Sequence, residues 1–157
     1  MKISSLPKLG LVLFWIIILS LGILVASNSK AAQFELADED KNIVTIKENE
    51  TINDNFIVIG KDLVMKGKIN GDLLVISDNI NLEGNVDGNI IAIGSSINSN
   101  LKGVRNVYLL GDKITFAGLV ERDLNVISRS LEIKNTTNIL GNFYAVVEKI
   151  NQSVDSK

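Results

Sequence analysis

Few residues in this chain have the types and spacing that chemistry requires. Asp38, Asp40 and Asn42 are spaced like the first ligands of a calcium-binding loop. Such a loop needs glycine at its sixth place and glutamate at its twelfth, where this chain has Ile43 and Asn49. An acidic, solvated linker is therefore the favoured interpretation of this segment.

Charged side chains that recur at a fixed interval are the second candidate. Arg105 and Arg122 occupy the same place in successive intervals, and Asp87 and Glu121 share the place before them. One interpretation is a ladder that binds a ligand. The favoured interpretation is a set of salt-bridged surface pairs, which are common and individually weak.

The composition excludes several kinds of catalytic site. The chain has no cysteine and no histidine, which rules out thiol catalysis, disulfides, thiolate metal sites and the usual general base. Residues 1–31 carry three of the 16 basic side chains and none of the 18 acidic ones, so the remainder has a net charge of −5. That sign is a poor match for nucleic acid. We therefore expect a non-enzymatic structural protein with no cofactor, no metal and no nucleic-acid partner.

The N-terminal segment has the composition of a signal peptide or a membrane anchor. Lys2 and Lys8 are basic, and residues 9–29 carry no charge. The small residues Ser29 and Ala31 fit cleavage after Ala31, while residues 9–29 are also long enough to span a bilayer. Both interpretations place the remainder outside the cytoplasm, membrane-anchored or secreted to the cell envelope.

The rest of the chain is an internal repeat. Its unit is Asn or Asp followed by four mostly apolar residues, and its period is 17, lengthening to 19 before the last copy. The six copies begin at Asn55, Asp72, Asn89, Asn106, Asp123 and Asn142. A second apolar column agrees with this period at Leu63, Ile80, Ile97, Ile114, Leu131 and Ile150. A third column slips by one place in the fourth copy, to Val104.

This repeat predicts a parallel β-solenoid. Its apolar residues alternate, as in strands, and glycines recur between them at positions suited to tight corners. Stacking identical columns gives about six 17-residue coils. The Asn70-Gly71 and Asp87-Gly88 pairs would also suit hairpins in an antiparallel sandwich, but a sandwich has no reason to repeat the same columns. Proline is absent after Pro7, as a continuous ladder of N–H donors requires.

The repeat also resembles a known family. The run from Gly67 to Ala92, with its Gly-Asp or Gly-Asn units and glycine corners, is similar to bactofilins, the polymer-forming cytoskeletal proteins. The resemblance covers residues 51–150. It implies a right-handed parallel β-helix that polymerises end to end without nucleotide. Family members are often bacterial and act in cell shape or envelope organisation.

These observations divide the chain into four parts. We expect a signal or anchor helix at residues 1–31, and an acidic linker with an N-terminal cap strand at residues 32–50. The β-helix follows at residues 51–150, and a polar tail at residues 151–157 ends the chain.

One strand of every coil is apolar on both faces. Alternation sends Phe56 and Val58 inward, which leaves their neighbours outward. We call these outward residues the apolar stripe: Ile57, Ile59, Leu74, Ile76, Ile91, Ile93, Tyr108, Leu110, Ile127, Tyr144 and Val146. Only Asn125 interrupts it. The stripe fits a lateral surface for another copy or an envelope component, although β-branched residues also suit exposed strands.

The two ends of the solenoid form a second candidate surface. The last coil carries Phe143, Tyr144 and Val146 with no proline or charge to protect its edge. The first coil is half covered by the strand from Ile43 to Ile46. Ile46 falls one repeat interval before Leu63, so we expect it to continue that column.

The functional prediction is a self-assembling structural protein of the cell envelope. Its main partner is the chain itself, with the membrane as a further partner if residues 9–29 are retained. The alternative is an exported monomeric β-helix that binds a surface glycan or an envelope protein.

Overall fold

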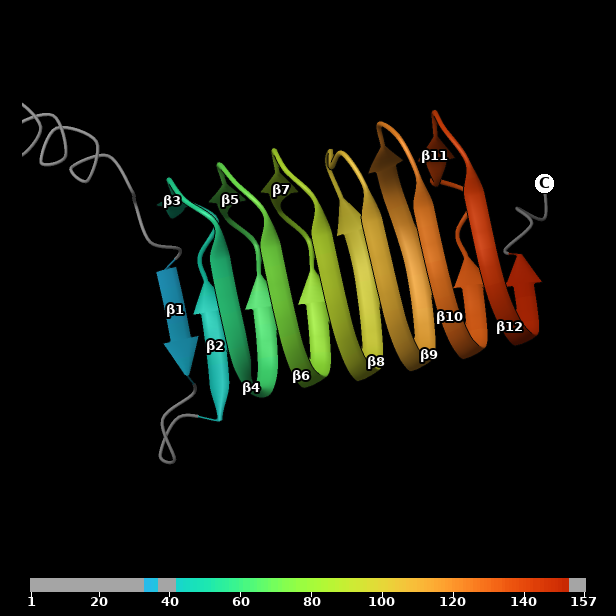
Figure 1. The fold of residues 1–157 in the computed structure, drawn as a ribbon, viewed down its shortest axis with the longest axis horizontal. Coiled ribbons are helices and arrows are strands. Elements are labelled where there is room, and N and C mark those ends of the chain that lie inside the picture. Colours follow the sequence, from blue (N-terminus) through green and yellow to red (C-terminus); the bar gives the residue numbers. More distant parts are fainter. Residues whose placement is uncertain (1–32, 37–41, 153–157) are drawn as a thin grey trace, which may run out of the picture. The chain divides into compact units, whose positions relative to one another are not determined.

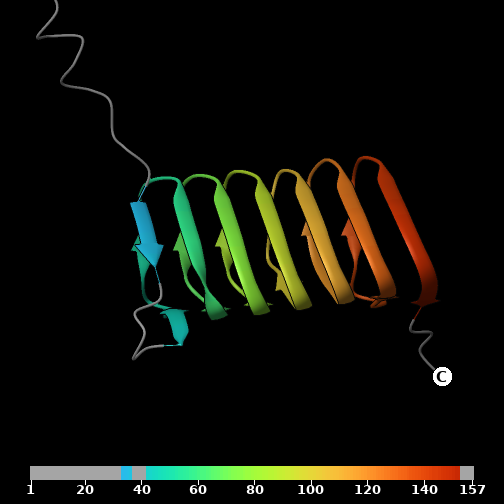
Figure 2. The same cartoon turned by 60° about the horizontal axis from the view of Figure 1, so that its bottom comes forward.

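The computed structural model describes residues 33–36 and 42–152, which form a parallel β-solenoid of about six turns (Figures 1 and 2). Every strand pairing in it is parallel. The strands are β1 (Gln33–Leu36), β2 (Ile43–Ile46), β3 (Thr51–Ile52), β4 (Phe56–Met65), β5 (Lys68–Ile69), β6 (Leu73–Leu82), β7 (Asn85–Val86), β8 (Ile90–Leu101), β9 (Val107–Val120), β10 (Leu124–Ile133), β11 (Asn138–Ile139) and β12 (Phe143–Gln152). The repeat therefore predicted the fold class correctly.

The predicted N-terminal helix lies outside these residues. The candidate anchor at residues 9–29 and the candidate cleavage site at Ala31 are both outside the described part of the chain. Within residues 33–36 and 42–152, no helix has the length and apolar character needed to cross a bilayer.

Each coil has three faces, because the long strands bend in their middle. In β4, residues 56–59 form the first face and residues 62–65 the second, with a corner at Gly60. The two-residue strands β3, β5, β7 and β11 lie on the third face. At Gly94 this corner has no room for a side chain, because a Cβ would overlap the carbonyl oxygen of Ser77 in the preceding coil.

The core fills the space between the three faces. Alternate residues of the first and second faces point inward, and stacking places each one over its counterpart in the next coil. The largest fully buried side chains include Ile46, Leu63, Met65, Leu73, Ile90, Ile97, Ile114, Phe116, Leu124 and Leu131. Val104, at the slip in the third column, is 1% exposed, and its carbonyl oxygen accepts a 2.8 Å hydrogen bond from the N–H of Glu121.

The register of the first coil corrects one expectation. Ile46 pairs with Met65, and Val44 pairs with Leu63, so the expectation that Ile46 continues the Leu63 column is wrong. The reason is the corner Lys47–Glu50, which is two residues longer than its counterpart Lys66–Gly67. The Glu50 N–H closes this corner by donating to the Lys47 carbonyl oxygen at 2.9 Å.

A corner of the same length explains the longer interval near the C-terminus. It spans residues 134–137, and the Thr137 N–H donates to the Lys134 carbonyl oxygen at 3.0 Å. This corner moves Phe143 into register with Leu124.

A ladder of polar side chains runs along the edge of the first face. Each member uses its side-chain oxygen to accept a hydrogen bond from the same place in the following coil. Asn55 accepts from the backbone N–H of Asp72 at 2.8 Å, and Asp72 from that of Asn89 at 2.7 Å. The later members are Asn106, Asp123 and Asn142, and the Asp123 carboxylate accepts from the Asn142 N–H at 2.8 Å. The direction of donation is the same at every step described.

Two buried serine hydroxyls at the corner provide a test of how much an unpaired polar group costs in this interior. The Ser77 and Ser128 hydroxyls are buried without a hydrogen-bond partner among the described residues, whereas the Ser99 hydroxyl donates to the Ala117 carbonyl oxygen at 3.3 Å. We expect Ser77→Ala to raise the free energy of unfolding by about 1–2 kcal/mol, because an unpaired buried hydroxyl is costly. The matched variant Ser99→Ala should lower it by about 1 kcal/mol. Urea titration followed by circular dichroism measures both, and a loss of stability in Ser77→Ala would contradict the prediction.

Candidate assembly surfaces

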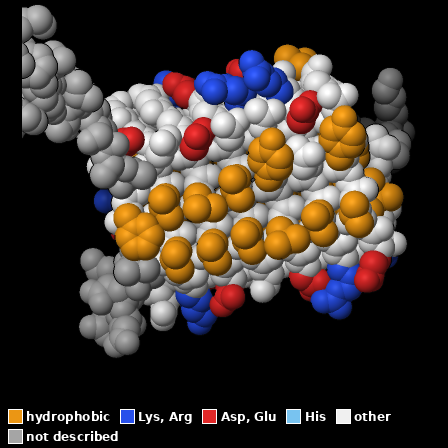
Figure 3. All heavy atoms as spheres, in the orientation of Figure 1, with side chains coloured by type: hydrophobic (Ala, Val, Ile, Leu, Met, Phe, Trp, Pro, Cys, Tyr) orange, Lys and Arg blue, Asp and Glu red, His pale blue; other side chains and the backbone are white. Residues whose placement is uncertain are grey.

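The apolar stripe covers the outer side of the first face. Strand pairing stacks its members in two rows, one containing Ile57 and Tyr108 and the other Ile59 and Leu110. Figure 3 shows these rows as two bands of hydrophobic side chains with charged side chains along both edges. The band that contains Tyr108 is interrupted, because Asn125 occupies the next place in its row. Most members are exposed, and Ile57, Leu74 and Ile93 are half-buried. The structure thus brings every predicted stripe residue onto one surface.

Strand β1 extends the stripe by a residue that sequence reasoning missed. Phe34 is 57% exposed and pairs with Ile57. The offset between these two positions is larger than the repeat period, so the periodicity of the sequence does not relate them. The alternation of polar and apolar residues in Gln33–Leu36 is the only signal for this strand in the sequence.

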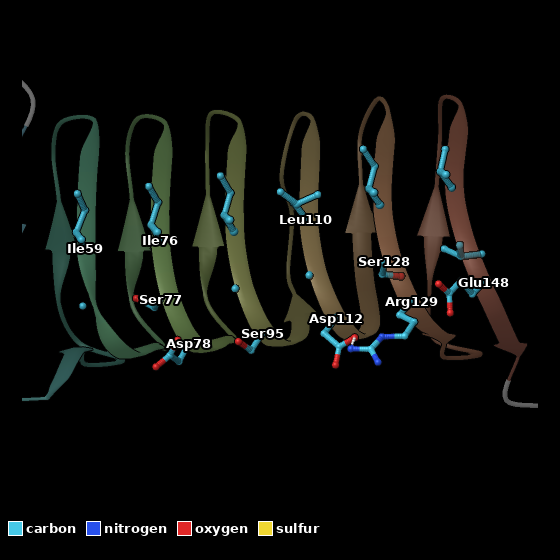
Figure 4. Close-up of a pocket in the computed structure, with 17 residues that line it drawn as sticks. Ile59, Ile76, Ser77, Asp78, Ser95, Leu110, Asp112, Ser128, Arg129 and Glu148 are labelled. Atoms are coloured by element: carbon cyan, nitrogen blue, oxygen red, sulfur yellow. Dashed lines mark ion pairs between the residues drawn. The ribbon is translucent and has the colours of Figure 1, made fainter.

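A shallow groove of about 850 Å³ runs beside the stripe, at the corner between the first and second faces. Its apolar wall includes Ile59, Ile76 and Leu110, and its opposite wall carries polar and charged side chains (Figure 4). The Arg129 guanidinium and the Asp112 carboxylate on that wall form an ion pair at 2.5 Å. Because the groove crosses all six coils, it is open to an extended partner.

The last described coil, which contains β12, is uncovered on its outer side. No strand among the described residues pairs with the outer edge of β12. The inward-facing Phe143 is 41% exposed and Ile150 is 54% exposed, because no further coil among the described residues covers them. Tyr144 and Val146, on the outer side of the same strand, are 58% and 70% exposed. This end therefore presents both unpaired backbone groups and uncovered core.

The N-terminal end differs from the C-terminal end. Val44 is 4% exposed and Ile46 is 2% exposed, so both side chains belong to the core. Ile43 is 55% exposed and remains free for contact with another molecule. Of the predicted end residues, the structure places Phe143, Tyr144, Val146 and Ile43 at the surface.

The candidates for chemistry remain surface features. The Arg105 guanidinium donates to the Asp87 carbonyl oxygen at 3.2 Å, and the Asp87 carboxylate pairs with Lys68 at 3.2 Å. The Arg105 contact is therefore with a backbone oxygen, and the ion pair of Asp87 is with Lys68, which the sequence-based expectation did not include. Asn42, Ile43 and Asn49 are described, whereas Asp38 and Asp40 are not. The described residues hold no cluster of three or more acidic side chains suited to a metal ion.

Comparison with known proteins leaves the repeat and its fold as the basis for functional inference. The chain matches no family model, no curated protein and no solved structure. The structure itself shows a β-solenoid of about six turns, with a long exposed apolar stripe and a last described coil that no other described strand covers.

Proposed function

We propose that this chain is a non-enzymatic, self-assembling structural protein of the cell envelope, similar to bactofilins in architecture. The observation that carries the proposal is the open last coil, where Phe143 and Ile150 leave the core uncovered. Stacking another coil on this end would pair the free backbone N–H and C=O groups of β12 and cover the exposed core side chains. The strand edge presents these groups at the spacing that a further parallel strand needs. End-to-end contact between copies supplies that coil.

Sedimentation velocity and negative-stain electron microscopy of the full chain in mild detergent test this proposal. We expect large, elongated assemblies whose abundance rises with protein concentration, since association is governed by mass action. A chain that remains monomeric at high concentration contradicts self-assembly.

A monomeric binding module is the second candidate, and one feature favours it. Asn125 lies between Tyr108 and Tyr144 in one row of the stripe, beside a hollow of about 230 Å³. Aromatic rings present large contact areas, and an amide can donate and accept hydrogen bonds. A monomer that binds members of a glycan array would support this candidate over assembly.

The location of the protein depends on the N-terminal segment. We propose export, with residues 9–29 acting as a signal or an anchor. If cleavage occurs after Ala31, Ala31→Arg should leave a larger, membrane-bound product, because a bulky charged side chain does not fit the peptidase site. Immunoblots of membrane and released fractions make the comparison. If the wild-type chain is already full length and membrane-bound, the segment is a retained anchor.

A further inference from the structure

A column of polar and charged side chains runs along the groove, one residue per coil. Each member directly follows the corner, and all are exposed. We call it the charge column: Lys61, Asp78, Ser95, Asp112, Arg129 and Glu148. Read from the first coil to the last, its charges are positive, negative, neutral, negative, positive and negative. If a second copy runs in the opposite direction, each pair of facing charges in the two columns has opposite signs.

The apolar stripe beside this column is large enough for a protein interface. Eight of its side chains are 39–70% exposed, and together they present on the order of 800 Å² of apolar surface. The largest apolar patch on a typical monomer is about 300–600 Å², whereas each partner in a standard interface buries about 800 Å². The stripe therefore matches one side of a stable dimer.

We propose that two copies of the chain pair face to face through the apolar stripe, with their solenoid axes antiparallel. The two-fold axis runs along the strands, between β8 and β9. This symmetry sets Lys61 opposite Glu148 of the second copy and Asp78 opposite its Arg129. Ser95 lies opposite Asp112, so no like charges meet anywhere along the charge column.

The charge column also selects the register. A shift by one coil in one direction sets Lys61 opposite Arg129 and Asp78 opposite Asp112. A shift in the other direction sets Asp78 opposite Glu148 and Asp112 opposite its own counterpart. Both shifts juxtapose like charges, which oppose association. Of these three registers, only the fully overlapping one is free of repulsion, and larger shifts leave a third or more of the six coils unpaired.

A parallel arrangement is less favourable. It sets the charge column of one copy against the other edge of the stripe in the second copy. Lys61 then meets Asp54 and Asp112 meets Arg105, but Arg129 meets Arg122. Charges at the rim of an interface contribute mostly to orientation and to the exclusion of wrong registers. They therefore favour the antiparallel pair, while the stripe supplies the affinity.

Cysteine cross-linking of the full chain in mild detergent tests the pairing. The native chain has no cysteine, so every cross-link joins introduced residues. In the variant carrying Ile76→Cys and Ile127→Cys, the two sites lie three coils apart within one chain, about 14 Å, too far for a disulfide. Across the proposed interface they face each other twice. We expect an oxidant or a short bis-maleimide to convert most of the protein into covalent dimers.

The matched control carries Ile59→Cys and Ile127→Cys, which are one coil out of register. We expect little covalent dimer from this control under the same conditions. Absence of dimers from the first variant, or equal yields from both, would overturn the proposal.

A charge exchange provides an independent arm in the Ile76→Cys and Ile127→Cys background. Lys61→Glu should weaken pairing about tenfold, because the new glutamate of each copy would lie opposite Glu148 of the other copy. Adding Glu148→Lys should restore it. Lys61 and Glu148 lie five coils apart in one chain, about 24 Å, so rescue requires contact between copies. Failure of the rescue would overturn the assigned register.

This pairing goes beyond the proposed end-to-end assembly and fails separately from it. Cysteines in the interior coils do not report contact between solenoid ends. Filaments without cross-linked dimers would overturn the lateral pairing and leave end-to-end assembly standing. Cross-linked dimers that never form larger assemblies would support the pairing and contradict the filament.

Discussion

Phe143→Arg is expected to break the assemblies of this chain into small particles that no longer sediment rapidly. Phe143 stacks over the fully buried Leu124 and is 41% exposed because β12 is the last of the described strands. At an end-to-end junction the next copy would cover it. A charge placed there without a partner costs several kcal/mol on burial.

Sedimentation velocity measures the loss of assembly, and circular dichroism checks that the β-sheet spectrum is kept. The control carries Ile91→Arg and Ile93→Arg in the apolar stripe. We expect this control to lose lateral pairing but to keep end-to-end assembly. If Phe143→Arg assembles like the parent while the control does not assemble at all, the stripe is the main interface and the end-to-end proposal fails.

Gly118→Ala should be the most destabilising single-methyl change in the solenoid. Gly118 has a φ of +115°, the only positive φ among the described residues, and this region favours glycine. A Cβ there would overlap the carbonyl oxygen of Leu101 and lie 2.6 Å from its nitrogen. Backbone strain and this overlap together should lower the free energy of unfolding by about 2–4 kcal/mol.

Gly103→Ala is the matched control for this change. The nearest atom to its new Cβ would be the Asn85 side-chain oxygen at 3.3 Å, which can move away. We expect a change within about 1 kcal/mol. Urea titration compares the two variants, and equal midpoints would show that the corner at Gly118 tolerates a side chain.

The repeat period predicted most of the fold, because stacked coils must repeat their core columns. It located the inward residues such as Leu73 and Ile90, and the outward stripe followed from strand alternation. It did not reveal the register of Ile46. Core columns in a strand are two residues apart, so a corner that is two residues longer maps core onto core. Leu63 and Met65 fit Ile46 equally well, and only the Lys47–Glu50 corner distinguishes them.

The candidate surfaces could be predicted only in part. The open end and the stripe follow from apolar residues at defined positions in the repeat. The residues of the charge column can also be identified in the sequence. Their role in pairing depends on their position beside the groove, and that position results from the bend at Gly60 and its counterparts. Strand β1 was not predicted. It has only four residues, and they pair with β4 at an offset that differs from the repeat period, so the periodicity gives no sign of them.

The polar ladder at the edge of the first face has a consequence for how the chain acquires its structure. The side-chain oxygen of each coil accepts a hydrogen bond from the coil that follows it in the sequence. When the chain is synthesised from its N-terminus, the side-chain oxygen of each folded coil is therefore already in place to accept a hydrogen bond from the next coil. Because consecutive coils are also neighbours in space, closing each coil costs little loop entropy. If the coils fold in the order of synthesis, only one coil is incomplete at any time, and it is the coil synthesised last.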